Sequence, residues 1–186
     1  KQLMDGYWER VEEYGKDKSP YRAGFAQTIV VAETDEEAEK EYREHIDYFY
    51  NRCLHVYPGF ADAPGYRTIK TLKANVTSQM TEQAFGNVSS MSWQQLIDDG
   101  YIIAGSPDTV ANQMKELATS LRVGNIFCLI HVGNMPQDKC MRSTKLFADE
   151  VIPQLRDMWP EYKDDNRFWI SPIDHANRAA AAAIGG

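Results

Sequence analysis

The sequence predicts an α/β fold in which parallel strands are covered by helices. Two observations support this prediction. The run 102–155 alternates short apolar segments with amphipathic ones, which is the pattern of a β-α-β-α unit. Three segments are almost continuously apolar, as expected for strands covered on both faces of a parallel sheet: residues 25–32, 101–104 and 126–132.

The helical elements before the second strand have recognisable ends. Residues 2–14 are expected to form a helix that ends at Gly15, a residue common just past helix ends. Thr34 and Glu37 form a capping box, which predicts a helix running to about residue 54. Apolar residues recur in that helix at three- and four-residue steps and predict one buried face: Ala38, Tyr42, Ile46, Phe49 and Cys53.

The remaining elements follow a long irregular stretch. Residues 58–91 are rich in Gly, Pro, Asn, Ser and Thr, and are far longer than the usual connection of about 4–6 residues. Ser92 and Gln95 form a second capping box, and its short helix is expected to stop at Gly100. Ser106 and Pro107 favour the start of the next helix. The alanine-rich end, residues 179–186, is expected to be a frayed or disordered tail.

Composition limits the possible partners. The chain has 186 residues, enough for one domain with a core, and carries a formal net charge of −7. Nucleic acid and anionic membranes require a basic face, so a small molecule or another protein is the expected partner. No segment approaches the roughly 20 apolar residues of a membrane span, and no signal-peptide pattern is seen. A cytoplasmic location is therefore expected.

The sequence lacks the motifs of several common kinds of site. The cysteines lack the paired spacing of a zinc site or disulfide framework, and all three are expected to be buried small hydrophobes: Cys53, Cys128 and Cys140. The sequence has no P-loop, no dinucleotide-binding glycine motif, no H-E-x-x-H zinc motif and no G-x-S-x-G nucleophile elbow. We therefore expect no metal site.

Two blocks of sequence resemble the bacterial luciferase-like, flavin-dependent monooxygenase family. The first, residues 25–38, reads FAQTIVVAETDEEA. The second begins at Gly105-Ser106-Pro107, continues through Gly133 and Pro136, and ends in FADEVIPQL at residues 147–155. Together they cover most of 21–155. The resemblance implies the C-terminal part of a (β/α)8 TIM barrel over residues 1–160, with a loop or lid insertion at about 57–91 and a C-terminal extension at 161–186.

A complete barrel takes about 250 residues, and each of its strands has two neighbours. This chain supplies three predicted strands, so the barrel within it is incomplete. An open three-stranded sheet would leave unpaired backbone groups along its edges. We therefore expect a homo-oligomer in which these edges are paired or covered across a two-fold axis.

The resemblance also implies an activity, in which reduced FMN activates O₂ to oxidise a small organic substrate and a flavin reductase is a possible partner. Two alternatives stay open: a deazaflavin-dependent oxidoreductase of the same superfamily, and a non-catalytic flavin-binding or structural dimer built on a reduced barrel. The family's main flavin-phosphate contacts lie in the half that this chain lacks. The isolated chain is therefore expected neither to hold FMN tightly nor to turn over, and no catalytic residue is assigned.

Candidate site residues follow from the rule that function gathers at the C-terminal ends of barrel strands. Glu33 follows the first strand, although a solvated carboxylate is the simpler interpretation. Backbone N–H groups at Gly105 and Ser106 are a candidate anion site, with helix capping as the favoured alternative. After the third strand come the candidate cofactor-binding residues, His131, Gly133 and Asn134. A structural histidine and a glycine-Asn turn are the competing interpretation.

The long insertion contains polar and aromatic side chains that the resemblance places in a mobile lid. Such a lid would shield a reactive flavin-oxygen intermediate from water. A poorly ordered surface insertion is the alternative. The residues concerned are Tyr57, Tyr66, Arg67, Lys70, Lys73, Asn75, Gln79 and Phe85.

Overall fold

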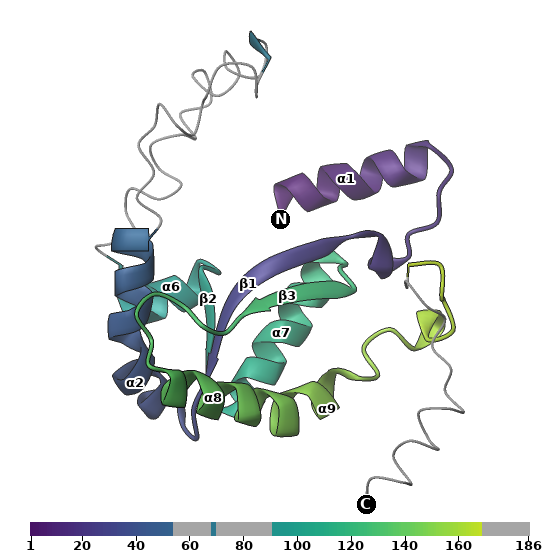
Figure 1. Ribbon diagram of the computed structural model, residues 1–186. Helices are drawn as coiled ribbons and strands as arrows, with labels where there is room; N and C mark the ends of the chain where they lie inside the picture. Colours follow the sequence, from purple (N-terminus) through teal and green to yellow (C-terminus); the bar gives the residue numbers. More distant parts are fainter. Residues whose placement is uncertain (54–67, 70–90, 169–186) are drawn as a thin grey trace, which may run out of the picture.

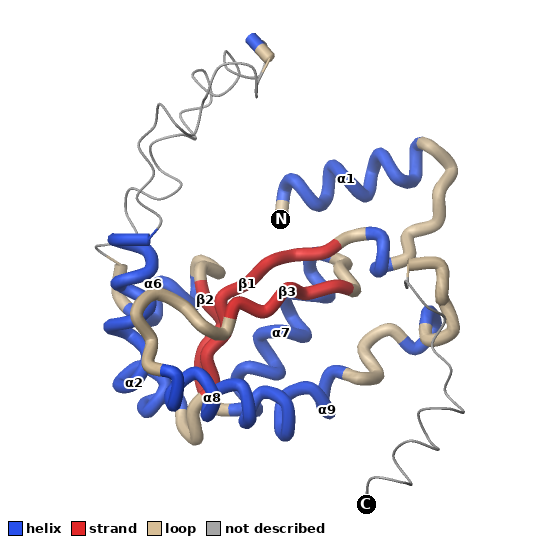
Figure 2. The backbone as a smooth tube through the Cα atoms, viewed as in Figure 1, coloured by secondary structure: helices blue, strands red, loops and turns tan. Residues whose placement is uncertain are grey.

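The computed structural model describes residues 1–53, 68–69 and 91–168. At its centre lies a sheet of three parallel strands in the order β2-β1-β3 (Figures 1 and 2). The strands are β1 (Gly24–Val31), β2 (Ile102–Gly105) and β3 (Asn125–Leu129). The predicted α/β class, with parallel strands of an incomplete barrel, is therefore confirmed.

β1 is the central strand. Its C-terminal half pairs with β2, from Thr28 opposite Ile102 to Val31 opposite Gly105. Its N-terminal half pairs with β3, which ends where Leu129 lies opposite Thr28. Successive strands of a closed barrel are neighbours. Here the connection from β2 to β3 passes β1 instead.

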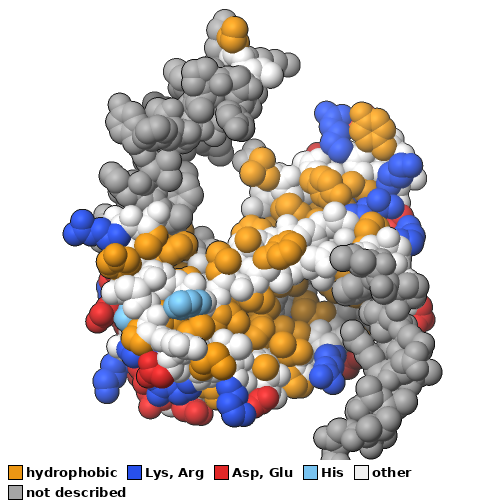
Figure 3. Space-filling model, in the orientation of Figure 1, with side chains coloured by type: hydrophobic (Ala, Val, Ile, Leu, Met, Phe, Trp, Pro, Cys, Tyr) orange, Lys and Arg blue, Asp and Glu red, His pale blue; other side chains and the backbone are white. Residues whose placement is uncertain are grey.

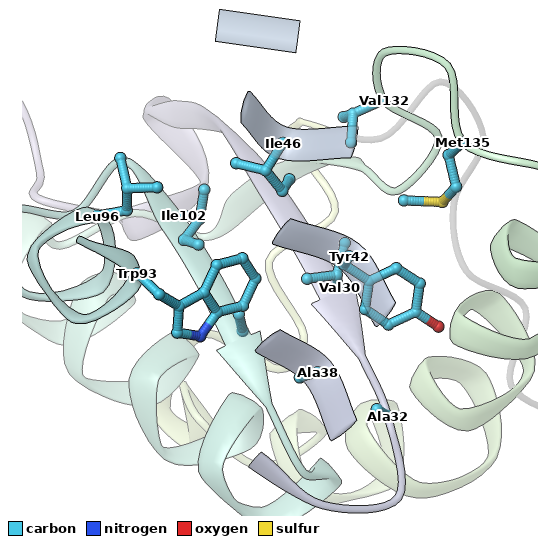
Figure 4. Packing of buried hydrophobic residues seen from close by; sticks show 11 residues of the cluster. Val30, Ala32, Ala38, Tyr42, Ile46, Trp93, Leu96, Ile102, Val132 and Met135 are labelled. Carbon is cyan, nitrogen blue, oxygen red and sulfur yellow. The ribbon is translucent and has the colours of Figure 1, made fainter. Parts of the chain in front are cut away.

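Helices cover both faces of the sheet. Side chains of successive strand residues point to opposite faces. Val30 and Ile102 pack with α2 (Asp35–Tyr48) and α6 (Trp93–Asp98), as Figure 4 shows. Ile29 and Ile103 pack with α7 (Pro107–Leu121) on the other face. α2 and α7 therefore enclose β1 and β2 between two apolar layers.

A continuous helical run follows β3. It consists of α8 (Gln137–Leu146), a π-helical turn η4 (Phe147–Val151) and α9 (Ile152–Leu155). In this run Ser143 is fully buried, and its hydroxyl accepts the Val31 backbone N–H at 2.9 Å. β1 extends past the end of β3, so Ser143 supplies the partner that a longer β3 would have given.

The predicted helix after β1 is present, but its last part is wider than an α-helix. The chain changes to a π-helix at η2 (Phe49–Cys53). A π-helical turn has more residues than an α-turn, so Cys53 leaves the apolar face that its spacing predicted. Cys53 is exposed, and Cys128 and Cys140 are only partly buried. The expectation that all three cysteines are buried was wrong.

The prediction that all three strands are covered on both faces holds for β1 and β2 but not for β3. Ile29, Val30 and Val31 are completely buried, and all four residues of β2 are buried. In β3, Phe127 is 67% exposed and Leu129 is 45% exposed. Among the described elements, α2 packs on β1 and β2 and leaves these two side chains uncovered.

The three remaining elements, α1, η1 and η5, lie near the end of the sheet where β1 begins. α1 (Gln2–Glu13) is anchored by buried Trp8, whose ring N–H donates to the Leu121 carbonyl at the end of α7 at 2.9 Å. The helix ends before Gly15, as predicted, with φ +63° at that glycine. Arg122 connects the segment before η1 (Pro20–Arg22) to η5 (Pro160–Tyr162), because its Nε donates to the Lys18 carbonyl at 2.7 Å and its Nη2 donates to the Tyr162 hydroxyl at 3.1 Å.

The start of the predicted extension, residues 161–168, is tied to the segment after α1 by charged groups. Arg167 donates to Asp17 at 2.9 and 3.0 Å and to Asp165 at 2.7 Å. These guanidinium contacts hold the pKa of both carboxyls well below the usual range. Residues 169–186 lie outside the described part. Within the described residues, no helix is long and apolar enough to cross a membrane.

Candidate functional site

The loops after the three strands are where ligands bind in parallel α/β folds. Residues 32–34 follow β1, residue 106 follows β2 and residues 130–136 follow β3. The candidate residues named from the sequence, apart from the insertion, all lie on or beside these loops. The structure shows what each of them contacts.

The loop after β2 is held by Asp35, in the first turn of α2. One carboxylate oxygen accepts the Ser106 backbone N–H at 2.6 Å, and the other accepts the Thr109 hydroxyl at 3.1 Å. The backbone hydrogen bond from Ser106 is the main reason why the pKa of Asp35 lies below its ordinary value. The N-terminus of α7 therefore already has an anion bound to it, supplied by the chain itself.

Gly105 is required by this arrangement. Its φ is +143°, a conformation that side chains rarely adopt, and a Cβ there would lie 2.5 Å from the Asp35 carboxylate. Ser106 caps α7, because its hydroxyl accepts the Thr109 backbone N–H. The capping interpretation of Ser106 is confirmed. A phosphate at this helix end would have to displace Asp35.

Glu33, the candidate after β1, is exposed and makes no hydrogen bond or ion pair to another described residue. The neighbouring Thr34 caps α2 by accepting the Glu37 backbone N–H at 3.2 Å. This environment agrees with the interpretation of Glu33 as a solvated carboxylate.

The loop after β3 contains the candidate cofactor-binding residues. His131 is exposed, and its Nε2 lies 2.9 Å from the Met135 carbonyl oxygen of the same loop. Gly133 has φ +58°, and a Cβ there would lie 2.5 Å from the His45 carbonyl and 3.2 Å from the Phe49 backbone nitrogen. Glycine at 133 therefore lets this loop approach the backbone of α2 closely.

Asn134 joins the loop to α2 through a residue that the sequence analysis did not single out. Its side-chain oxygen lies 2.8 Å from Nδ1 of His45, which is only 4% exposed. Because an amide oxygen only accepts hydrogen bonds, this contact places a proton on Nδ1 of His45. The other ring nitrogen, Nε2, is buried and has no hydrogen-bond partner among the described groups.

The spacing of residues along α2 could have identified His45 as a buried residue. It lies three residues after Tyr42 and four before Phe49, so it belongs to the same face of α2 as the apolar residues that predicted the core. The apolar pattern alone selected Ile46 and omitted the polar residue beside it. A polar group on a buried face needs a partner, and Asn134 provides it.

The structure separates the two groups of candidates. Asp35 and the Ser106 loop lie at the start of α2, whereas His45 and Asn134 meet near its end. Ten residues of helix between Asp35 and His45 correspond to about 15 Å. β3 ends halfway along β1, and this places its following loop against the later turns of α2.

The described residues alone do not fit a complete FMN site. A flavin phosphate needs several donors, and the N-terminus of α7 is occupied by Asp35. Two hollows, of about 490 and 360 Å³, lie beside β2 and β3, and neither lining includes a residue of the loop 130–136. In the described parts of the chain, no three His, Cys, Asp or Glu side chains are grouped as metal ligands.

The lid prediction falls on residues outside the described part. This applies to all of the side chains named for it: Tyr57, Tyr66, Arg67, Lys70, Lys73, Asn75, Gln79 and Phe85. The lid therefore stays a prediction.

Two solved structures share this fold. The monooxygenase RslO1 from Streptomyces bottropensis has 15% sequence identity and a TM-score of 0.50, over 82% of this chain and 36% of that one. The second is the oxygenating constituent of 3,6-diketocamphane monooxygenase from the CAM plasmid of Pseudomonas putida, a type II Baeyer-Villiger monooxygenase in complex with FMN. It has 22% identity and a TM-score of 0.50, over 81% of this chain and 38% of that one.

At these identities the likeness concerns the fold alone. The chain spans little more than a third of the length of either structure. A comparison with curated proteins gave no match. The family model for luciferase-like monooxygenases matches residues 1–123, which is about two thirds of the sequence. The chain therefore belongs to the luciferase-like monooxygenase family.

Proposed function

We propose that this chain is the C-terminal part of a flavin-dependent monooxygenase, in which reduced FMN and O₂ oxidise a small organic substrate. The observation that carries the proposal is the family match over residues 1–123. The FMN complex of the similar Pseudomonas putida protein supports flavin as the cofactor. In such enzymes the cofactor performs the difficult chemistry, while the protein binds and orients the reactants.

In this proposal the loop after β3 forms one wall of the flavin pocket. His131, Gly133 and Asn134 remain the candidate residues, and His45 fixes the loop by holding the Asn134 amide. The phosphate contacts come from polypeptide that this chain does not include. The chain alone is therefore expected to bind FMN weakly and to have no turnover.

The test compares the 186-residue chain with a longer protein read from the same frame, if intact-mass analysis of the native product reveals one. Each is titrated with FMN, passed through gel filtration and examined by visible absorption. Reduced FMN is then supplied by a flavin reductase, and O₂ consumption is followed. Free reduced FMN itself reacts with O₂, so the control is the reductase and FMN alone. The proposal predicts retained flavin and, when a small organic substrate is added, O₂ consumption above this control for the longer protein. A longer protein that retains no flavin and consumes no O₂ beyond the control would refute it.

A deazaflavin-dependent oxidoreductase gives a different result in the same experiment. Hydride transfer without oxygenation leaves O₂ unconsumed, while the deazaflavin cofactor is reduced as the substrate is oxidised, or oxidised as the substrate is reduced. Substrate-dependent O₂ uptake with FMN therefore favours the monooxygenase, and turnover only with the deazaflavin favours the alternative.

A non-catalytic structural module is the second candidate, and two contacts favour it. The Ser106 N–H at the N-terminus of α7 donates to Asp35, and the ring of His131 is hydrogen-bonded to the Met135 carbonyl of its own loop. A structural module predicts a native product of 21.2 kDa that unfolds cooperatively and is not stabilised by FMN. A larger native mass, or an FMN-dependent rise in melting temperature, would argue against it.

A further inference from the structure

The chain that follows α9 runs back to the segment before β1 (Figure 1). We call residues 156–168 the strap. No residue of the strap is buried, and it contains the short turn η5. Segments that bury little apolar surface open at a lower free energy than the core of a fold. The strap therefore depends on its polar contacts to stay in place.

The first attachment of the strap is Arg122, at the end of α7. Its backbone has φ +51°, a left-handed conformation that glycine adopts at lower cost. Its side chain donates to the Lys18 carbonyl and to the Tyr162 hydroxyl. The guanidinium also lies 5.6 Å from the ring centre of Trp159 and 5.9 Å from that of Tyr162. These contacts offset the backbone cost of an arginine at this position.

The second attachment is Arg167, near the other end of the strap. Its guanidinium donates to both carboxylate oxygens of Asp17, at 2.9 and 3.0 Å, so the two groups form a bidentate pair. Asp17 also accepts a hydrogen bond from Arg22 at 2.6 Å. Asp165 accepts from Arg167 and from the hydroxyl of Ser19, which is fully buried. Bidentate geometry within a network makes this attachment stronger than an isolated surface ion pair.

The strap forms one wall of the hollow of about 360 Å³ beside β3. Met158 and Trp159 of the strap line it, together with Val123, Ile126 and Cys128. Figure 3 shows hydrophobic side chains gathered on the side of the molecule that carries β3, α8 and α9. Movement of the strap away from the sheet would therefore open the hollow to solvent.

We propose that the strap opens as one unit while the sheet stays folded, and that Arg122 and Arg167 together hold it closed. Charged groups make most of its contacts, so salt weakens the closed state. The strap lies at the end of the sheet where β1 begins, away from the loops that follow the strands. Its opening is therefore independent of the proposed flavin chemistry.

The thiol of Cys128 reports on opening, because it lines the hollow and is partly buried. Burial raises the pKa of this thiol, which slows its reaction while the strap is closed. Cys53→Ser with Cys140→Ser leaves Cys128 as the single thiol. Cys53→Ser with Cys128→Ser leaves Cys140, which is partly buried on α8 and does not line the hollow. The rate of labelling by an aromatic disulfide is measured for each protein.

Two substitutions release the strap at different places. Arg167→Gln removes the pair with Asp17, far from the hollow that Arg167 does not line. Arg122→Gly removes the other side chain and leaves the backbone with the residue that its φ favours. Each is expected to raise the labelling rate of Cys128 about five- to tenfold and to leave that of Cys140 unchanged.

The matched control is Arg43→Gln. Arg43 is also partly exposed and forms ion pairs with Glu39 and Asp47, but all three residues belong to α2. This variant is expected to label at the original rate. Far-UV circular dichroism checks that each variant is folded.

Salt tests the strap without any change to the two arginines. Raising NaCl from about 0.1 to 1 M is expected to speed the labelling of Cys128 relative to that of Cys140. Equal acceleration of both thiols, by salt or by substitution, would mean that the whole fold opens and would overturn the proposal. A response to only one of the two arginine variants would also overturn it, because the strap would then fray in parts. So would unchanged labelling of Cys128.

Discussion

Replacing Asp35 by alanine tests how the two strand-end loops are joined. The substitution removes both hydrogen bonds, to the Ser106 N–H and to the Thr109 hydroxyl, and takes the Asp35 carboxylate away from the N-terminus of α7. We expect lower stability because a backbone N–H at the end of β2 loses its partner. Asp35→Asn retains one oxygen acceptor but removes the charge.

The expected loss in the free energy of unfolding depends on the exposure of Asp35. A hydrogen bond to a charged group contributes about 1.5–3 kcal/mol when sheltered. Asp35 is exposed, so solvent screening reduces its contribution towards the range of helix-capping residues, about 0.5–2 kcal/mol. We expect Asp35→Ala to lower the free energy of unfolding by about 1 kcal/mol. Asp35→Asn should cost less.

Urea unfolding as a function of pH provides the measurement. The pKa of Asp35 is lowered in the folded state. Its stabilisation is therefore fully present above the unfolded-state pKa of about 3.9, and is lost as the pH falls through the lower folded-state value. The difference between wild type and Asp35→Asn should be constant near neutral pH and shrink below about pH 4. Glu36→Gln, an exposed carboxylate in the same turn, is the control. An Asp35 effect no larger than that of the control would refute the reasoning.

Two further substitutions test the other contacts. Gly133→Ala is expected to lower the free energy of unfolding by about 1–3 kcal/mol, because φ at 133 is positive and a Cβ there would lie 2.5 Å from the His45 carbonyl. The control is Gly6→Ala, on α1, where a Cβ would meet open space. In the same denaturant titration, Gly6→Ala should be neutral or stabilising. Ser143→Ala is expected to lower the free energy of unfolding by about 1–3 kcal/mol, because the buried Val31 N–H loses its partner. The exchange of that amide, measured by hydrogen-exchange NMR, should become faster. Unchanged exchange would contradict this prediction.

The local elements were largely predictable from sequence. The apolar segments identified all three strands, with ends that moved by one to three residues. Ser92 and Gln95 form the reciprocal capping box that their spacing predicted. At Thr34 only the bond from the Glu37 N–H is present, yet it still begins α2 at the expected place. Such signals are local, because a cap or a strand depends on a few neighbouring residues.

The long-range contacts were not predictable in the same way. No pattern in the sequence predicts three of the hydrogen-bonded contacts. These are Asp35 with the Ser106 N–H, Gln113 with the Ala104 backbone, and His45 with the Asn134 side chain. Each pair joins residues from different elements, and the pairing depends on strand order. The sequence did indicate an open sheet, but it gave no sign that β1 would be central. The exposure of Phe127 follows from that order, since α2 covers only β1 and β2.

The amide pairing of Gln113 with Ala104 also limits how large an assembly can become. A sheet with two receptive edges can add copies at both ends, which leads to open-ended fibres. Here one edge is closed from within by a side chain of the same chain. The Gln113 amide makes both hydrogen bonds that a neighbouring strand would otherwise make to Ala104. Gln113→Ala removes both bonds, and is expected to leave the Ala104 N–H and carbonyl open to a strand of another molecule.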